Sequence, residues 1–215
     1  GHVRVYGWIN SSWVQLGLDI DGEAADDESS AYAVSLSSDG TILAIGASKN
    51  DGTAGNAGHV RVYQWNNLSW DQIGSDIDGE AANDEFGFGV SLSSDGTIIA
   101  ISGWANDGTA SNAGHVRVYQ CINSSWVQLG SDIDGEASGD YSGISISLSS
   151  DGTIVAIGSI YHDGNTGHVK VYQWNNGSWD QLGSNIDGES VNNYSGWSVS
   201  LSSDGTIVAI GAPYN

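Results

Sequence analysis

The residues best suited to chemistry in this sequence are carboxylates in a short acidic segment that occurs four times. It reads Asp76-Ile77-Asp78-Gly79-Glu80 in one copy, and the fourth copy begins with Asn185 instead of aspartate. Alternating oxygen ligands followed by a glycine can wrap Ca²⁺, which takes about six to eight oxygens. A plain solvated connection is the alternative, because no complete calcium loop of about twelve residues is present, and the sequence requires no cofactor. The candidate calcium ligands are Asp19, Asp21, Asp76, Asp78, Asp132, Asp134 and Asp187.

A second recurring pattern is Asn-x-Ser, the acceptor for N-linked glycans in secreted proteins. An exposed turn accommodates a bulky glycan, although Asn and Ser are also frequent turn formers in their own right. Four copies fall at one place in the repeat, a turn between two expected strands, and a fifth occurs only in the last unit. If they are used, these sites indicate a secreted eukaryotic protein. The candidate acceptors are Asn10, Asn67, Asn123, Asn176 and Asn193.

Tryptophans follow each of the four repeated acceptors. Exposed indole rings can stack on sugars, which would make the protein a multivalent lectin. Packing between neighbouring sheets is the alternative that we favour, because aromatic side chains dominate the burial available to such sheets. The candidate sugar-stacking residues are Trp13, Trp70, Trp126 and Trp179.

The remaining reactive residues give little support to catalysis. One histidine follows a glycine at the start of each unit, where it would lie far from its counterparts, and only His162 falls outside this pattern. Cys121 is the single cysteine and takes the place of Trp8, Trp65 and Trp174 in the other units. No nucleophile elbow, phosphate loop or zinc motif is present. We therefore expect structural histidines, an unreactive cysteine and no enzymatic activity.

These residues are positioned by a repeat of about 55 residues. The string Gly-His-Val opens each unit, and the units differ mainly in loop length. We treat 1–215 as a single repeat domain, since one such unit cannot bury both faces of a sheet alone. The repeats are 1–57, 58–113, 114–166 and 167–215.

Each unit shows four strand patterns, at 58–65, 69–74, 89–93 and 97–102 in the second unit. Apolar residues alternate with polar ones in the first, and Asp95-Gly96 between the last two is a strong hairpin signal. The sequence predicts an all-β β-propeller of four four-stranded antiparallel blades, with the apolar pair nearest the axis. A β-solenoid-like array is the alternative.

The phase of the repeat leaves two arrangements open. The chain begins with an outer strand pair and ends with an inner one. The last inner pair could join the first outer pair of the same chain and close a ring, or it could join a neighbouring copy. Methionine is absent, so we expect a processed chain or one cut from a longer protein.

Charge excludes several partners. Acidic residues number 26 against 5 Lys and Arg, for a formal net charge of -21. Such a surface repels nucleic acid and anionic membranes. No apolar run of about eighteen residues could insert into a membrane. Neighbouring copies of the protein, covalent glycans and cations remain as partners.

The chain resembles the FG-GAP repeats of integrin-α-like β-propellers. The motifs are Phe86-Gly87 before one strand and Gly211-Ala212-Pro213 after another, with degenerate copies at Tyr141-Ser142-Gly143 and Gly46-Ala47-Ser48. The resemblance implies an extracellular propeller used in adhesion or assembly. Many members bind calcium in an Asp-rich inter-strand loop, but here that loop is only Ser-Ser-Asp-Gly, so the family's metal site is not carried over.

Together these features predict an extracellular or cell-surface protein. The leading hypothesis is a structural or self-assembling repeat protein, a component of a surface appendage or filament. The alternative is a discrete adhesion or carbohydrate-binding propeller.

Overall fold

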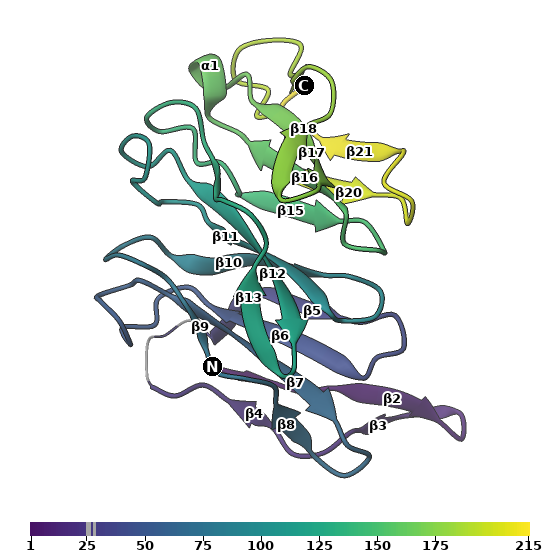
Figure 1. The fold of residues 1–215 in the computed structure, drawn as a ribbon. Helices are drawn as coiled ribbons and strands as arrows, with labels where there is room; N and C mark the ends of the chain where they lie inside the picture. The colour runs from purple at the N-terminus through teal and green to yellow at the C-terminus, as the bar shows by residue number, and fades with distance from the viewer. Residues whose placement is uncertain (25–26, 28) are drawn as a thin grey trace.

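The computed structural model describes residues 1–24, 27 and 29–215 and consists of short antiparallel strands arranged one sheet after another (Figure 1). The only helix in this described part is α1 (His162–Asn165), which is too short to cross a membrane. The first complete sheet contains β5 (Ser29–Leu36), β6 (Ile42–Ala47), β7 (His59–Trp65), β8 (Trp70–Gln72) and β9 (Ile77–Asp78). The second contains β10 (Phe86–Leu92), β11 (Ile98–Gly103), β12 (His115–Ile122), β13 (Ser125–Gln128) and β14 (Ile133–Asp134). The third contains β15 (Ser145–Leu148), β16 (Ile154–Ser159), β17 (His168–Asn175), β18 (Ser178–Gln181) and β19 (Ile186–Asp187).

Strand pairs at the two ends of the chain form smaller sheets. In the first unit β1 (His2–Val3) pairs with β4 (Ile20–Asp21), and β2 (Tyr6–Ile9) pairs with β3 (Ser12–Gln15). In the last unit β20 (Ser198–Leu201) pairs with β21 (Val208–Gly211). Within the described residues no strand pairing joins these two ends, which lie at opposite ends of the molecule (Figure 1). The ring is therefore not closed within this structure.

The complete sheets have five strands, which corrects the expected four. In the first complete sheet the strand order is β5-β6-β7-β8, and the short strand β9 pairs with the part of β7 that β8 does not cover. The other two complete sheets have the equivalent order. Residues expected to lie in a loop thus form a ladder, in which Ile77 faces Val60 and Asp78 faces His59. The physical reason is burial: Ile77 is 5% exposed, and strand pairing buries this side chain while it satisfies the backbone groups beside it.

The turn between the two inner strands of each sheet is closed by one aspartate. Asp95 Oδ1 accepts hydrogen bonds from Ser93 Oγ at 2.7 Å and from the Thr97 backbone amide at 3.0 Å. Gly96 follows with φ of 71°, a conformation that favours glycine. Burial raises the pKa of Asp95, but these hydrogen bonds outweigh it and leave the pKa lowered. The carboxylate is therefore occupied by hydrogen bonds within its own turn.

Successive sheets contact one another through their innermost strands. The Leu92 amide of β10 donates to Ser35 Oγ of β5 at 3.0 Å. The same bond joins Leu148 to Ser91 and Leu201 to Ser147, each at 3.0 Å. The apolar hairpin therefore forms the inner edge of each blade, as its composition predicts.

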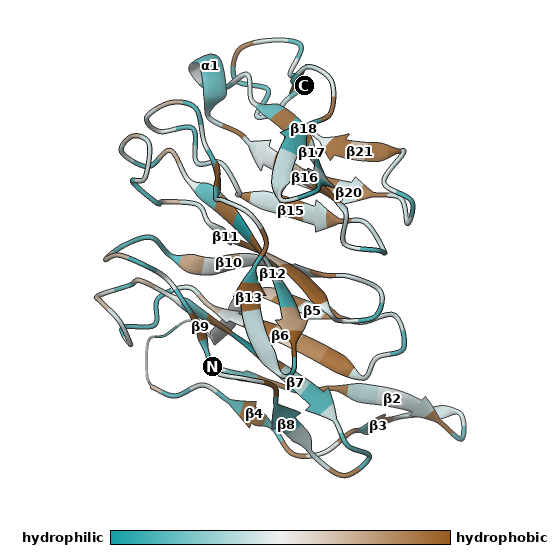
Figure 2. Ribbon diagram, in the orientation of Figure 1, coloured by the Kyte–Doolittle hydropathy of each residue, from teal (hydrophilic) through white to brown (hydrophobic). Residues whose placement is uncertain are grey.

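The core lies between neighbouring sheets. Val60, Phe86, Ile99 and Ile101 have no exposed surface and pack into one cluster that joins the first two complete sheets. Figure 2 shows the hydrophobic colour along β6 and β21, whereas the connecting loops are mostly hydrophilic. Each blade thus obtains its core from its neighbour, as expected for a stacked repeat.

Candidate functional site

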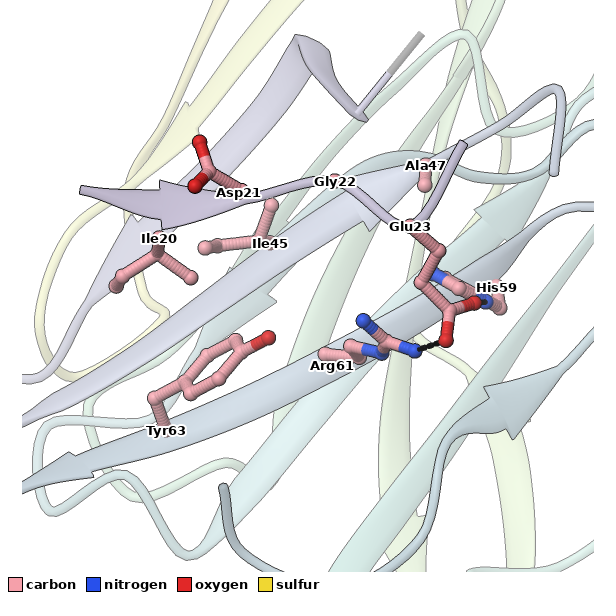
Figure 3. Close-up of a pocket in the computed structure, with 9 residues that line it drawn as sticks. All are labelled: Ile20, Asp21, Gly22, Glu23, Ile45, Ala47, His59, Arg61 and Tyr63. Carbon is pink, nitrogen blue, oxygen red and sulfur yellow. Dashed lines mark ion pairs between the residues drawn. The ribbon is translucent and has the colours of Figure 1, made fainter. Parts of the chain in front are cut away.

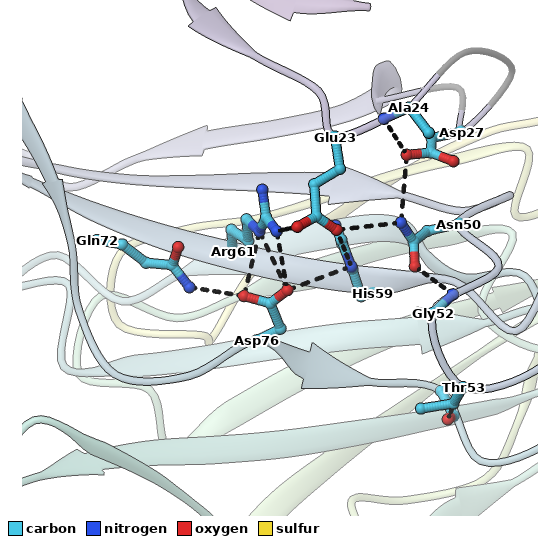
Figure 4. Close-up of polar contacts among 11 residues, drawn as sticks. Glu23, Ala24, Asp27, Asn50, Gly52, Thr53, His59, Arg61, Gln72 and Asp76 are labelled. Carbon is cyan, nitrogen blue, oxygen red and sulfur yellow. Dashed lines mark hydrogen bonds and ion pairs between the residues drawn. The ribbon is translucent and has the colours of Figure 1, made fainter.

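A cluster of charged residues lies at the junction between the first two units (Figure 4), and related clusters occur at the next two junctions. Strand β7 places His59 and Arg61 two residues apart, so both side chains lie on one face. Arg61 Nε donates to both carboxylate oxygens of Asp76 at 3.1 Å. Arg61 also forms an ion pair with Glu23, which belongs to the preceding unit. One guanidinium therefore joins two carboxylates from successive units of the chain.

The second junction repeats this cluster with Glu80, His115, Arg117 and Asp132, and it is more deeply buried. Arg117 Nη2 lies 2.9 Å from Asp132 and pairs with Glu80 of the preceding unit. The Arg117 guanidinium also stands 5.9 Å above the ring of Phe86. Arg117 is 5% exposed and His115 is 1% exposed. The geometry is that of a charge-assisted clamp inside the interface between two sheets.

Burial sets the charge states of this clamp. Burial, and to a lesser extent the neighbouring Arg117, lowers the pKa of His115 to about 4, so the imidazole is neutral at pH 7. Burial raises the pKa of Asp132, but hydrogen bonds from Arg117 and Gln128 outweigh this effect and leave the pKa lowered. At neutral pH the clamp is one guanidinium, two carboxylates and an uncharged histidine.

The buried histidines make the stability of the fold depend on pH between their folded and unfolded pKa values. Burial lowers the pKa of His115 and of His168 to about 4, whereas an unfolded histidine titrates near pH 6.5. Between these values the unfolded chain binds protons that the native chain does not, so stability falls as the pH falls. We expect a loss on the order of 1–2 kcal/mol per histidine between pH 7 and 5, measurable by urea unfolding.

Three carboxylates act in the opposite direction. Partial burial raises the pKa of Asp78, Asp84 and Asp134, so their protonation favours the native state. The control is therefore the variant His115→Gln, whose stability should change less between pH 7 and 5 than that of the natural chain. An equal change in both proteins would contradict the assignment to His115.

The crevice beside the first cluster is too small for an organic substrate (Figure 3). It is lined by Ile20, Glu23, His59, Arg61 and Tyr63 among others and has a volume of about 10 Å³. A cavity of about 10–15 Å³ holds one water molecule. This crevice therefore has room for about one water molecule, and the clamp residues beside it join two units of the chain.

The structure separates the aspartates of the acidic segment. Asp19, Asp76 and Asp132 each accept hydrogen bonds from an arginine of their own unit. The second aspartate of each copy is exposed, namely Asp21, Asp78, Asp134 and Asp187. Potential ligand clusters in the described part of the chain combine histidine with carboxylates, and none contains both aspartates of one copy. Calcium at the acidic segment remains a prediction, and it would compete with a guanidinium.

Four of the five candidate glycan acceptors lie at exposed turns. Asn10, Asn67, Asn123 and Asn176 are all exposed, with φ between 49° and 74°. Asn193 differs, because it is 6% exposed. Its Oδ1 accepts from the Ser190 amide at 2.6 Å and its Nδ2 donates to the Tyr214 carbonyl at 3.2 Å. The Asn193 side chain is therefore far less accessible than the other four, and glycosylation at all five positions stays a prediction.

The tryptophans proposed for sugar stacking make contacts between units. Nε1 of Trp70 donates to the Leu16 carbonyl at 3.0 Å, and Trp126 makes the same bond to Ile73 at 3.0 Å. Trp179 donates to Leu129 at 2.9 Å. Trp13, in the first unit, is 67% exposed. Packing between units thus accounts for three of the four positions.

Comparisons with known proteins extend to the fold alone. No protein-family model and no curated protein sequence matches this chain. Among solved structures, a 6-phosphogluconolactonase-like protein from Bacteroides uniformis is similar, with a TM-score of 0.55 and 13% identity, over 83% of this chain and 46% of that one. The fold is propeller-like. TolB from Acinetobacter baumannii also matches, with a TM-score of 0.45 and 12% identity over 83% of this chain and 36% of TolB.

The chain spans less than half the length of either of these structures. At 13% identity the similarity describes architecture, and a propeller-like fold hosts many unrelated activities. The FG-GAP resemblance and the absence of enzymatic activity therefore stay predictions from the sequence.

Proposed function

We propose that this chain is an extracellular structural repeat protein that self-assembles by repeating one junction between blades, in units of four blades. The observation that carries the proposal is the regularity of that junction. The serine bond at the inner edge and the tryptophan bond at the outer edge recur from unit to unit with distances of 2.9–3.0 Å. Such head-to-tail contacts either close into a ring or continue as a filament.

Contact residues of this junction are exposed in the first and last units. Trp13 is 67% exposed, and Leu182, whose carbonyl corresponds to that of Leu129, is 41% exposed. Among the described residues β21 pairs with β20 alone, and an open strand edge is a template for another strand. By the register that pairs Val155 with Tyr172 and Ala156 with Val171, Val208 would pair with Tyr6 of a second copy.

A discrete binding propeller is the second candidate, and one cleft favours it. Inner strands β5, β10, β15 and β20 line a cleft of about 560 Å³ with aromatic side chains that include Phe88, Trp104, Tyr161 and Trp197. This volume suits a small ligand such as a sugar, and indole and phenol rings provide flat faces for stacking. The residues that line it contribute no histidine or carboxylate, so this candidate is a binding protein.

A disulfide trap tests the junction. The variant Tyr6→Cys, Val208→Cys is made in a Cys121→Ser background, which leaves no other cysteine. If the copies assemble as proposed, oxidation yields a ladder of covalent oligomers on a non-reducing gel, because paired residues of neighbouring strands lie within disulfide reach. The matched control is Tyr6→Cys, Asp204→Cys, which places the second cysteine in the hairpin turn and should yield no ladder.

The two candidates give different products in this experiment. A covalent ladder whose length grows with protein concentration supports the self-assembling protein. A cross-linked monomer at every concentration means that one chain closes its own ring. That result would favour the discrete propeller over the self-assembling protein. No cross-link in either form contradicts the junction itself.

Glycosylation at the blade turns is the other testable part of this proposal. We expect glycans on Asn10, Asn67, Asn123 and Asn176 when the chain is secreted from eukaryotic cells, because all four are exposed. Peptide mapping after deglycosylation in heavy-oxygen water would mark each occupied site. The buried Asn193 is the internal control and should remain unmodified. Four unmodified turns would refute this part of the proposal.

A further inference from the structure

The third junction departs from the clamp of the first two. Lys170 replaces the arginine, and Asn185 replaces the aspartate that the arginine binds. His162 stands where the first two units have Asn50 and Asn106. The substitutions remove the guanidinium–carboxylate pair. They also place a second histidine, His162, beside His168, the histidine that has a counterpart at every junction. The differences from the first two junctions therefore fall on one group of neighbouring residues, His162, Lys170 and Asn185.

These replacements bring together potential metal ligands from three elements. His162 begins α1, His168 begins β17, and Glu136 follows β14. One nitrogen of each imidazole and one carboxylate oxygen of Glu136 lie within 4.8 Å of one another. The two imidazole rings are tilted, with centroids 4.1 Å apart. The His168 side chain is 2% exposed and that of His162 is 26% exposed, so the group is open to solvent on one side.

We propose that Glu136, His162 and His168 bind a transition-metal dication, with Zn²⁺ as the best match, at this third junction. Imidazole nitrogen and carboxylate oxygen are the donors that zinc takes in protein sites, with space left for a water ligand. Ligands about 2.0–2.1 Å from a tetrahedral zinc lie roughly 3.3 Å apart. The three ligand atoms lie within 4.8 Å of one another, and binding requires the exposed Glu136 side chain to move the remaining distance.

A second carboxylate supports this assignment. Asp140 Oδ2 lies 3.1 Å from His162 Nδ1, and the Asp140 side chain is 6% exposed. A carboxylate bound to one imidazole nitrogen fixes the ring and directs the other nitrogen to the metal, which is the usual outer-shell arrangement at zinc sites. Asp140 is a positioning residue in this site.

The first two junctions do not offer the same site. Glu23–His59–Asp76 and Glu80–His115–Asp132 are also grouped, but Arg61 and Arg117 bind both carboxylates of their groups. A divalent cation there would have to displace a buried guanidinium. Among the described residues of the third junction, Glu136 pairs with Lys170 at 2.5 Å, and a carboxylate has a second oxygen for the metal.

Zinc titration of the full chain tests the proposal. After treatment with chelator, the chain is titrated with zinc chloride by calorimetry, and we expect one Zn²⁺ per chain. The variant His162→Asn restores the residue of the other units and should weaken binding by about tenfold or more. The matched control His59→Asn removes a histidine from a guanidinium-filled cluster and should leave zinc affinity unchanged.

Nuclear magnetic resonance of the natural chain gives a readout that does not depend on variants. The chain has five histidines, and saturation with zinc should shift the ring signals of His162 and His168 and leave those of His2, His59 and His115 in place. No heat of binding, an unchanged affinity in His162→Asn, or shifts of other histidine rings would each overturn the proposal.

Discussion

Replacement of Gly58 by alanine is expected to destabilise the chain by about 4 kcal/mol or more. Gly58 has φ of 77°, where a side chain is strained. A β-carbon at Gly58 would lie 2.1 Å from the carbonyl oxygen of Phe86 and 2.8 Å from that of Ser48. Both are backbone atoms, so relief of the clash requires two chain segments to move. Urea unfolding followed by tryptophan fluorescence measures the loss.

The matched control is Gly40→Ala in the preceding hairpin turn. Gly40 has nearly the same φ, 72°, but nothing lies within 4 Å of an added β-carbon. Its replacement should cost only about 1–2 kcal/mol, the price of the left-handed conformation alone. The difference between the two variants isolates the close approach of the backbone at Gly58. Equal losses would mean that the segments do not meet there.

The close approach at Gly58 also explains why glycine opens each unit. The Gly58 carbonyl accepts from the Gly79 amide at 2.8 Å, and its own amide donates to the Asn50 carbonyl at 3.0 Å. Three segments of the chain therefore cross at one residue. The repeat of Gly-His-Val reveals a special position from sequence alone, but only the structure shows which segments meet there.

Strand positions follow from the sequence because alternation and turn chemistry are local. The strands expected at 89–93 and 97–102 correspond to β10 and β11, and the Asp95-Gly96 turn joins them. Strand β10 begins three residues before the expected start, at Phe86, which pairs with Gly103. The register of the ladder shifts between Phe86 and Gly89. Such an irregularity leaves no periodic pattern in the sequence.

Contacts between units are harder to predict than strands, because no local pattern sets the position of one sheet against the next. Glu23 and Arg61 form an ion pair across a junction, yet each belongs to a motif that repeats in every unit. The glutamate that ends each acidic segment is the one sequence feature that could have indicated this ion pair. The acidic segment, however, reads like a solvated loop. For the same reason, the sequence does not distinguish the buried Asn193 from the four exposed acceptor candidates.

Replacement of Arg117 by methionine is expected to cost about 3–5 kcal/mol, because it leaves Asp132 and Glu80 in a junction without their cation. Arg117 is 5% exposed, so water cannot readily replace the guanidinium. Methionine keeps much of the side-chain volume, which limits the effect of a cavity. Urea unfolding at pH 7 measures the change in the free energy of unfolding.

The first unit provides the matched control, and pH separates charge from packing. Arg4 forms the same bond to Asp19, but its side chain is 46% exposed, so Arg4→Met should leave stability unchanged within error. Asp132 has a lowered pKa in the natural chain, so the stability that it contributes is present at neutral pH and is lost as the pH falls through that pKa. The difference between the natural chain and Arg117→Met should therefore shrink as the pH falls below about 4. A difference that stays constant with pH would show that Arg117 stabilises the junction by packing and not by charge.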